Sequence, residues 1–394
     1  YGRLPGPPEG GLGRQLAVGR FPARSRTELR AMVDKTLAYA AVAGGEWQRR
    51  LALFAGPAKF TPFLDGIIES QVKHLLDDQI PYDFDLSFVF AKPDSPYAWR
   101  PDDLAQKITR ELGRGAILSA YFGHGMPTAF DYVEYGDKYY PIGEAAPLAA
   151  ISAEGGPPVF VALACDIGAI DLLGGELSLA EVLFQNPKGP VAVVASARES
   201  HPYPNALYGQ ALIDAFLRQR APSIGEGLVR AKALAGDHRL ALLEAFVEVD
   251  VSSLLDEHAA LYNLLGDPAL PLRYTRGLTV ETSPVGAGLA GSTVEVRVAS
   301  GEPTTLTFET RRDVIRGALE PLVGKEQAEA LEAMTRNWAT AMDKVVARFE
   351  SDGKAPWTLQ LPKEPGSYIL KALGAGKDAA SGFLRFDVLP SPPP

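Results

Sequence analysis

The chain has 394 residues, which at roughly 150 residues per domain indicates two or three domains. Hydrophobic residues make up 46% and charged residues 22%, a balance typical of folded globular proteins that excludes a disordered or fibrous chain. The net charge is −9 and no run of Lys or Arg occurs, which argues against nucleic acid as a partner, and no apolar stretch is long enough to span a membrane.

The amino-terminal residues 1–15 are predicted to form a flexible tail, because eight of the first fourteen residues are Gly or Pro. The sequence begins with Tyr1 instead of Met. We therefore expect a trimmed or processed start, at which a targeting segment would not be visible.

Residues 16–274 alternate short apolar runs with helical patterns, which predicts an α/β domain with a mostly parallel sheet flanked by helices. A helix is expected after Ser25, whose hydroxyl can cap it together with Glu28, and a second helix over 63–76. The last three predicted strands are almost continuously apolar, as expected where both faces of a sheet are covered. The strands are expected at 16–18, 51–55, 86–90, 115–121, 158–164 and 190–195.

Residues 275–394 change to strand-like alternation, which predicts an all-β sandwich. Its strands are expected at 279–282, 293–299, 304–310, 357–361, 367–373 and 382–389. A helical insert is expected at about 314–350, where apolar residues repeat at spacings of three and four. We interpret this stripe as packing on the sandwich or on the main domain; a partner-binding helix is the alternative. The stripe consists of Leu331, Met334, Trp338, Met342, Val345 and Phe349.

Two short motifs carry the candidate chemistry: Gly123-His124-Gly125 and Ala164-Cys165, each of which follows an apolar strand. Ligands bind at the carboxyl ends of parallel strands, where a thiol can act as an acyl-transfer nucleophile and an imidazole as its acid and base. The amides of Gly125 and Cys165 are candidates for an oxyanion hole. Taken singly, a cysteine at a strand end is most often a buried small hydrophobe, and a histidine between glycines is as often structural as catalytic.

Further residues near these motifs are weaker candidates. Phe122, Leu163 and His201 are predicted to bind substrate, with a surface-loop role as the alternative for His201. Asp166 is expected to cap a helix after the cysteine, and Asp267 to be a turn residue. No histidine shows metal-ligand spacing, so we predict no metal site and no required cofactor; calcium held by loop carboxylates stays open.

The sequence resembles the gingipain-type cysteine peptidases, which have a caspase-like fold followed by an immunoglobulin-like domain. The resemblance covers about Ala17 to Arg273, and the strand-rich residues 275–394 match the second domain of that family. It rests on segments that occur in the same order: Val18 to Pro22 with the helix through Lys35, Thr36 and Tyr39, Gly123-His124-Gly125, Ala164-Cys165, Gly189 to Ser196, Gly209-Gln210, and Leu265 to Pro268.

The resemblance implies a cysteine endopeptidase in which Cys165 is the nucleophile and His124 the general acid and base. It places Asp65 at the base of the primary pocket, at the family's distance after Gly56-Pro57, where a carboxylate selects Arg, or less well Lys, before the scissile bond. A solvated residue at a helix start is the alternative for Asp65. The family's acidic residue that orients the histidine falls on Phe54, so that member is absent or supplied elsewhere.

Gingipains also carry a subdomain before the first matched segment, where this sequence has only 17 residues of tail. That subdomain is missing, replaced or a separate chain, so we expect a processing or truncation point here and count an amino-terminal subdomain or propeptide chain, beside the peptide substrate, among the candidate partners. The resemblance favours a secreted or periplasmic protein, with the cytoplasm left open. A transpeptidase or processing enzyme for one partner, and a catalytically silent caspase-like recognition module, are the alternative functions.

Overall fold

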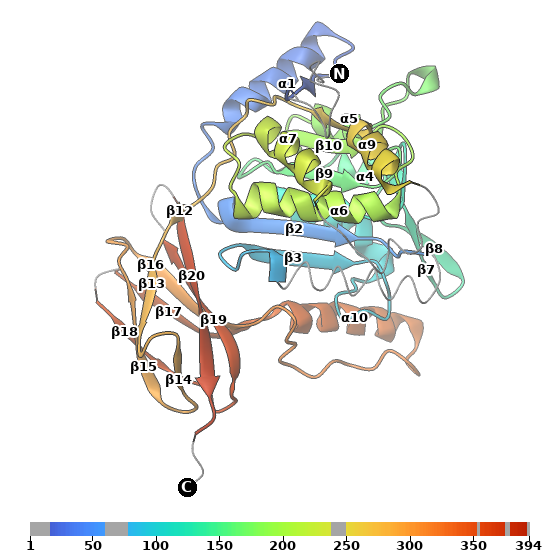
Figure 1. The fold of residues 1–394 in the computed structure, drawn as a ribbon. Coiled ribbons are helices and arrows are strands. Elements are labelled where there is room, and N and C mark those ends of the chain that lie inside the picture. Colours follow the sequence, from blue (N-terminus) through green and yellow to red (C-terminus); the bar gives the residue numbers. More distant parts are fainter. Residues whose placement is uncertain (1–15, 60–77, 238–249, 353–354, 375–378, 392–394) are drawn as a thin grey trace.

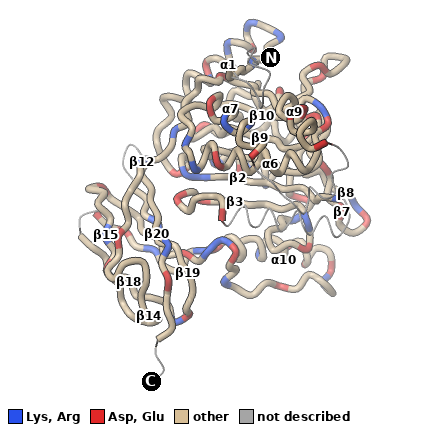
Figure 2. The backbone as a smooth tube through the Cα atoms, in the orientation of Figure 1, with Lys and Arg blue, Asp and Glu red and all other residues tan. Residues whose placement is uncertain are grey.

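The computed structural model describes residues 16–59, 78–237, 250–352, 355–374 and 379–391. A helix-covered sheet is followed in the chain by a β-sandwich that carries one long helix (Figure 1). Figure 2 shows Lys and Arg mixed with Asp and Glu along both parts, as the weakly negative net charge predicts. Within the described ranges, no helix has both the length and the apolar character needed to cross a membrane.

Within the described residues, the first part contains a seven-stranded sheet in which only β11 and β10 pair antiparallel. The predicted α/β class with a mostly parallel sheet is thereby confirmed. In spatial order the strands are β1 (Gly19–Arg20), β11 (Tyr262–Leu265), β10 (Ala192–Ser196), β9 (Val159–Leu163), β4 (Leu118–Phe122), β2 (Arg50–Ala55) and β3 (Asp85–Phe90).

The first strand lies at Gly19–Arg20 instead of the predicted 16–18. Leu16 and Val18 are exposed, so local apolarity does not mark the strand. Its position depends on parallel pairing with β11, where a Cβ on Gly19 would lie 2.1 Å from the carbonyl oxygen of Gly266. Only glycine permits this close approach.

Helices cover both faces of the sheet, and alternate residues of β2 enter two separate cores. Leu51 and Leu53 pack toward α6 and α7, whereas Ala52 and Phe54 pack toward α3 and α5. The predicted cap of α1 is confirmed, because the Ser25 hydroxyl accepts from the Glu28 amide at 3.2 Å. The helices are α1 (Arg26–Tyr39), α3 (Leu104–Gly113), α4 (Ala145–Leu148), α5 (Leu179–Gln185), α6 (Pro202–Ile213), α7 (Ile224–Ala235) and α9 (Val251–Leu261).

Shorter elements connect these helices and strands. Two hairpins follow β4: β5 (Gly125–Met126) with β6 (Ala129–Phe130), and β7 (Tyr132–Tyr135) with β8 (Lys138–Pro141). Single helical turns are η1 (Glu46–Arg49), η3 (Pro101–Asp103) and η4 (Leu173–Gly175), and a π-helical turn, η5 (Asp214–Arg218), extends α6.

The carboxyl-terminal part is a two-sheet sandwich, as predicted, with a core that includes Val296, Phe308, Leu370 and Phe386. Its immunoglobulin-like character stays a prediction. One sheet contains, in order, β12 (Arg276–Gly277), β20 (Ala380–Leu389), β19 (Gly366–Gly374), β16 (Thr304–Thr310) and β17 (Val345–Ser351), with β14 (Ala287–Leu289) also paired to β20. The other contains β13 (Val280–Ser283), β15 (Thr293–Val298) and β18 (Trp357–Gln360).

The helix expected within 314–350 is limited to α10 (Gln327–Met342). Val345 and Phe349 continue the apolar spacing but lie on β17, where Phe349 pairs with Leu306 of β16. Helix α10 packs along the edge strand β3 of the main domain (Figure 1), and the Trp338 indole donates to the Phe88 carbonyl at 2.8 Å. The interpretation that the helical part of the stripe packs on the sandwich or on the main domain is therefore confirmed, with the main domain as the contact.

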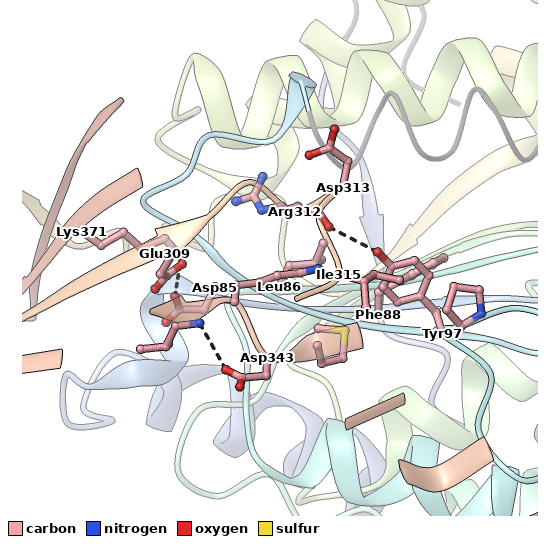
Figure 3. Close-up of a pocket in the computed structure, with 14 residues that line it drawn as sticks. Asp85, Leu86, Phe88, Tyr97, Glu309, Arg312, Asp313, Ile315, Asp343 and Lys371 are labelled. Carbon is pink, nitrogen blue, oxygen red and sulfur yellow. Dashed lines mark hydrogen bonds and ion pairs between the residues drawn. The ribbon is translucent and has the colours of Figure 1, made fainter. Parts of the chain in front are cut away.

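Buried polar contacts hold the two parts together where the sandwich meets β3. Arg312 donates to the carbonyls of Ile80, Pro81 and Phe84, and Lys371 pairs with Asp85 and Glu309 at 3.2 and 2.7 Å. Asp85, Glu309, Arg312 and Lys371 border a cavity of about 370 Å³ between the two parts (Figure 3). Neither His124 nor Cys165 lines it, so the cavity is separate from the candidate site.

We expect Lys371→Met to weaken this junction, because it leaves the carboxylates of Asp85 and Glu309 without their shared cation. The loss should be about 1–3 kcal/mol, since Asp85 keeps 36% of its side chain exposed and solvent screens part of the interaction. Burial opposes ionisation of Asp85, but Lys371 and Arg49 outweigh it and hold its pKa below the usual 3.8. The contribution is therefore present above that pH and is lost below it.

Urea unfolding of wild type and Lys371→Met at neutral pH and near pH 3 measures this effect. The difference in unfolding free energy should be largest at neutral pH and should shrink in acid. A difference that grows on acidification would show that the pair does not stabilise the junction.

Candidate active site

The two motifs singled out in the sequence lie side by side at the carboxyl end of the sheet. Strands β4 and β9 are adjacent and parallel, with Phe122 opposite Leu163, and His124 and Cys165 each follow two residues later. A Cβ on Gly125 would lie 2.6 Å from the Cys165 carbonyl oxygen. Glycine at this position thus lets the histidine segment contact the cysteine segment directly.

A backbone carbonyl orients His124. Its Nε2 lies 2.7 Å from the carbonyl oxygen of Ala58, three residues past the end of β2. Because a carbonyl only accepts, Nε2 carries the hydrogen, and Nδ1 is the basic nitrogen of the neutral ring. Phe54, where the resemblance places an acidic residue, is 1% exposed within the core. The Ala58 carbonyl therefore supplies the orienting acceptor that the sequence left open.

Lys59 holds the segment that carries Ala58 in place. Lys59 has a positive φ of 56°, which is uncommon for a residue with a side chain. Its ammonium pairs with Asp131 at 2.7 Å and donates to the Tyr132 carbonyl at 2.8 Å. These contacts hold the strained turn in place and, through it, the acceptor of His124.

Cys165 is half-buried, and its sulfur contacts Ser200, four residues past the end of β10. The Ser200 amide donates to Sγ at 3.3 Å, the Ser200 hydroxyl lies at 3.7 Å, and the thiol donates to the Ser200 carbonyl at 3.5 Å. A hydrogen-bond donor aimed at sulfur stabilises its thiolate form. The prediction that Asp166 caps a helix is wrong, because the next α-helix is α5, capped by Ser178. Asp166 has a φ of 58° and lies in a turn.

The predicted substrate-binding residues have different surroundings. Phe122 is partly buried and Leu163 is 2% exposed, and both contact α6 at Gly209. Leu163 thus packs in the core under α6, and its role in substrate binding stays a prediction. His201 is half-buried and caps α6, its Nδ1 accepting from the Tyr203 amide at 3.2 Å. Burial lowers the pKa of His201. Asp65 lies outside the described residues.

The sequence analysis missed four residues: Ala58, which contacts His124; Ser200, which contacts the Cys165 sulfur; and Asn205 and His258, which connect to Ser200 by hydrogen bonds. Asn205 donates to the Ser200 hydroxyl at 2.9 Å and accepts from Tyr262, while His258 contacts the Asn205 amide oxygen at 2.6 Å. No local pattern marks them, because Ala58 follows β2, Ser200 follows β10, and Asn205 and His258 lie on α6 and α9, in distant parts of the chain. The one weak sequence signal that could have identified Ser200 and Asn205 is that they follow the apolar strand β10.

Two remaining expectations concern turns and metals. Asp267 forms the predicted turn, accepting from the Ala269 amide at 2.9 Å. Among the described residues, no group of three or more His, Cys, Asp or Glu side chains is arranged to hold a metal ion. Calcium therefore stays an untested expectation without a located site.

Comparisons with known proteins agree with this architecture. The sequence profile of peptidase family C25 matches residues 10–273. A solved protease structure matches with a TM-score of 0.50 at 14% identity, covering 97% of this chain and 76% of that chain. No curated protein matches significantly.

Two gingipain structures show weaker likeness. The Arg-specific cysteine proteinase gingipain R matches with a TM-score of 0.47 at 15% identity, covering 95% of this chain and 74% of that one. The complex of the pro- and mature domains of RgpB from Porphyromonas gingivalis matches with a TM-score of 0.46 at 15% identity, covering 96% and 77%. At such identities, structural likeness concerns the fold alone.

Proposed function

Because the chain belongs to peptidase family C25 and is a cysteine peptidase, we propose that it hydrolyses peptide bonds with Cys165 as nucleophile and His124 as general acid and base. The observation that carries the proposal is the placement of both residues two positions past paired ends of adjacent strands, with Gly125 against Cys165. The oriented imidazole, with Nε2 on the Ala58 carbonyl, supports it.

In the proposed reaction, Nδ1 of His124 takes the thiol proton and the sulfur attacks the substrate carbonyl carbon. The amides of Gly125 and Cys165 stabilise the oxyanion, each contributing on the order of 3 kcal/mol. The imidazolium then protonates the leaving amine as the peptide C–N bond breaks, which leaves an acyl-enzyme. Water, deprotonated by the same imidazole, hydrolyses the thioester to release the acid and restore the thiol.

A peptide carrying a thiol-reactive group tests this assignment. It should label the wild-type protein on Cys165, and excess peptide substrate should protect against labelling. Labelling that persists unchanged in Cys165→Ala would place the reactive group elsewhere.

We further propose that Asp65 selects Arg, and less well Lys, before the scissile bond, on the basis of its position after Gly56-Pro57 in the sequence. A substrate series that differs only at that residue should show this preference, and Asp65→Ala should reduce it at least tenfold, roughly the value of one charge-assisted hydrogen bond. Asp65→Glu serves as the control that keeps the charge. Cleavage after Asp, Asn or apolar residues by the wild-type protein would contradict the pocket assignment.

The proposal includes a secreted or periplasmic protein whose partner is an amino-terminal subdomain or propeptide. The RgpB complex, in which pro- and mature domains of that protein are bound to each other, is the precedent for such a partner. Purification of the protein from its native source, followed by intact-mass measurement of the complex, would test this, and a protein recovered without any bound subdomain or propeptide would contradict it.

A further inference from the structure

A chain of hydrogen bonds runs from the buried His258 to the sulfur of Cys165. We propose that this relay, through Asn205, aims the Ser200 hydroxyl hydrogen at the sulfur and so stabilises the thiolate that attacks substrate. Ser200 touches the reacting atom, whereas Asn205 and His258 act as positioning residues. The inference rests on the proposed role of Cys165 as nucleophile.

The relay consists of residues that lie on, or directly follow, four elements of the main domain. Ser200 follows β10, Asn205 lies in the first turns of α6, His258 is on α9 and Tyr262 begins β11. Helices α6 and α9 lie next to each other in front of the sheet (Figure 1). His258 is 4% exposed and packs edge-on against Tyr208, with ring centroids 5.7 Å apart. The far end of the relay is thus shielded from solvent.

The donor or acceptor character of each atom defines the direction of each hydrogen bond. The Tyr262 hydroxyl lies 2.7 Å from Oδ1 of Asn205, a normal length for O–H···O, and Nε2 of His258 lies at 2.6 Å from the same oxygen. An amide oxygen only accepts, so both partners donate to it. The amide nitrogen of Asn205 is thereby turned toward Ser200, where its 2.9 Å contact with Oγ has the usual N–H···O length.

The protonation of His258 is consistent with this direction. Burial, followed by the nearby charges of Lys232 and His201, lowers the pKa of His258 to about 3. The ring is therefore neutral at physiological pH and carries one hydrogen. That hydrogen is on Nε2, as the contact with the Asn205 oxygen requires.

The consequence for Ser200 is that its hydroxyl accepts from Asn205 and keeps its own hydrogen for another acceptor. The Cys165 sulfur, 3.7 Å away, and the Tyr262 hydroxyl oxygen are the side-chain acceptors beside it, and the relay assigns the hydrogen to the sulfur. The Ser200 amide approaches the same sulfur at 3.3 Å. The Ser200 carbonyl, at 3.5 Å, accepts from the neutral thiol and opposes ionisation. Hydrogen bonds to an ionised acceptor are about twice as strong as neutral ones, so each of the two donors holds the sulfur more strongly once it is a thiolate.

The test is the rate at which iodoacetamide alkylates Cys165 across a range of pH, which measures the thiolate without any peptide substrate. Ser200→Ala keeps the amide donor and loses the hydroxyl, and should shift the rate profile to higher pH, with alkylation near pH 6 slowed roughly tenfold, the effect of one charge-assisted hydrogen bond. Ser200→Thr keeps the hydroxyl and should stay within about twofold of wild type.

Asn205→Asp provides a second, nearly isosteric variant. Its carboxylate only accepts, so it turns the Ser200 hydroxyl hydrogen away from sulfur and should shift the profile in the same direction as Ser200→Ala. Ser223→Ala removes the cap of α7 and is the control for lost stability without contact to sulfur. Thermal unfolding of each variant establishes that it is folded.

An unchanged profile in Ser200→Ala, an equal shift in Ser223→Ala, or failure of Ser200→Thr to preserve the rate would overturn the relay. These results differ from failure of the proposed function, which would appear as peptide hydrolysis that survives in Cys165→Ala. The alkylation rates test the relay, and the rates of peptide hydrolysis test the assignment of Cys165 as the nucleophile.

Discussion

Replacement of Cys165 by Ala should abolish peptide hydrolysis, with a loss in kcat on the order of 10⁵-fold or more, because no other described side chain at these strand ends offers a thiolate. The fold should persist, since the half-buried sulfur at a strand end leaves only a small void. Initial rates on peptide amides, measured beside thermal unfolding of the same samples, check both parts of the expectation.

His124→Ala is the companion variant. Loss of the acid and base should reduce kcat by about 10² to 10⁴-fold, because positioned proton transfer typically contributes that much. In contrast to Cys165→Ala, this variant should still react with iodoacetamide at alkaline pH. Wild-type turnover in Cys165→Ala would reject the nucleophile assignment.

Glu111→Gln should destabilise the main domain by about 3–5 kcal/mol, because it leaves two buried cations without their anion. Glu111 on α3 is 3% exposed, pairs with Arg50 of β2, and accepts from Lys107 and Ser87 at 2.7 and 2.8 Å. Burial opposes its ionisation, but Lys107 and Arg50 outweigh burial and lower the pKa of Glu111 from the usual 4.5. The stabilisation is thus present above that pH and is lost as pH falls below it.

Urea unfolding of wild type and Glu111→Gln at neutral pH gives the change in free energy. Glu332→Gln is the matched control, because Glu332 pairs with Arg100 at 2.7 Å but is 58% exposed, and it should cost well under about 1 kcal/mol. Equal losses in the two variants would show that burial of Glu111 does not determine how much its ion pairs contribute to the free energy of unfolding.

The sequence determined the features that depend on neighbouring residues. Short, mostly apolar runs marked β2, β3, β4, β9 and β10, and alternation marked most strands of the sandwich, because burial on one or both faces requires these patterns. The placement of His124 and Cys165 after strands was predictable for the same reason. A parallel sheet brings such carboxyl ends to one edge, so the predicted fold placed both residues at that edge, and the adjacency of β4 and β9 made them neighbours.

Only the tertiary structure decided what depends on strand order, register and side-chain direction. The order β10, β9, β4, β2 brings Ser200, Cys165, His124 and Ala58 together, although no local pattern relates these residues. Pairing with β16 likewise turns the end of the apolar stripe into β17, and packing under α6 buries Leu163. A backbone acceptor such as the Ala58 carbonyl has no side-chain signature, so its role becomes visible only when distant segments are in contact.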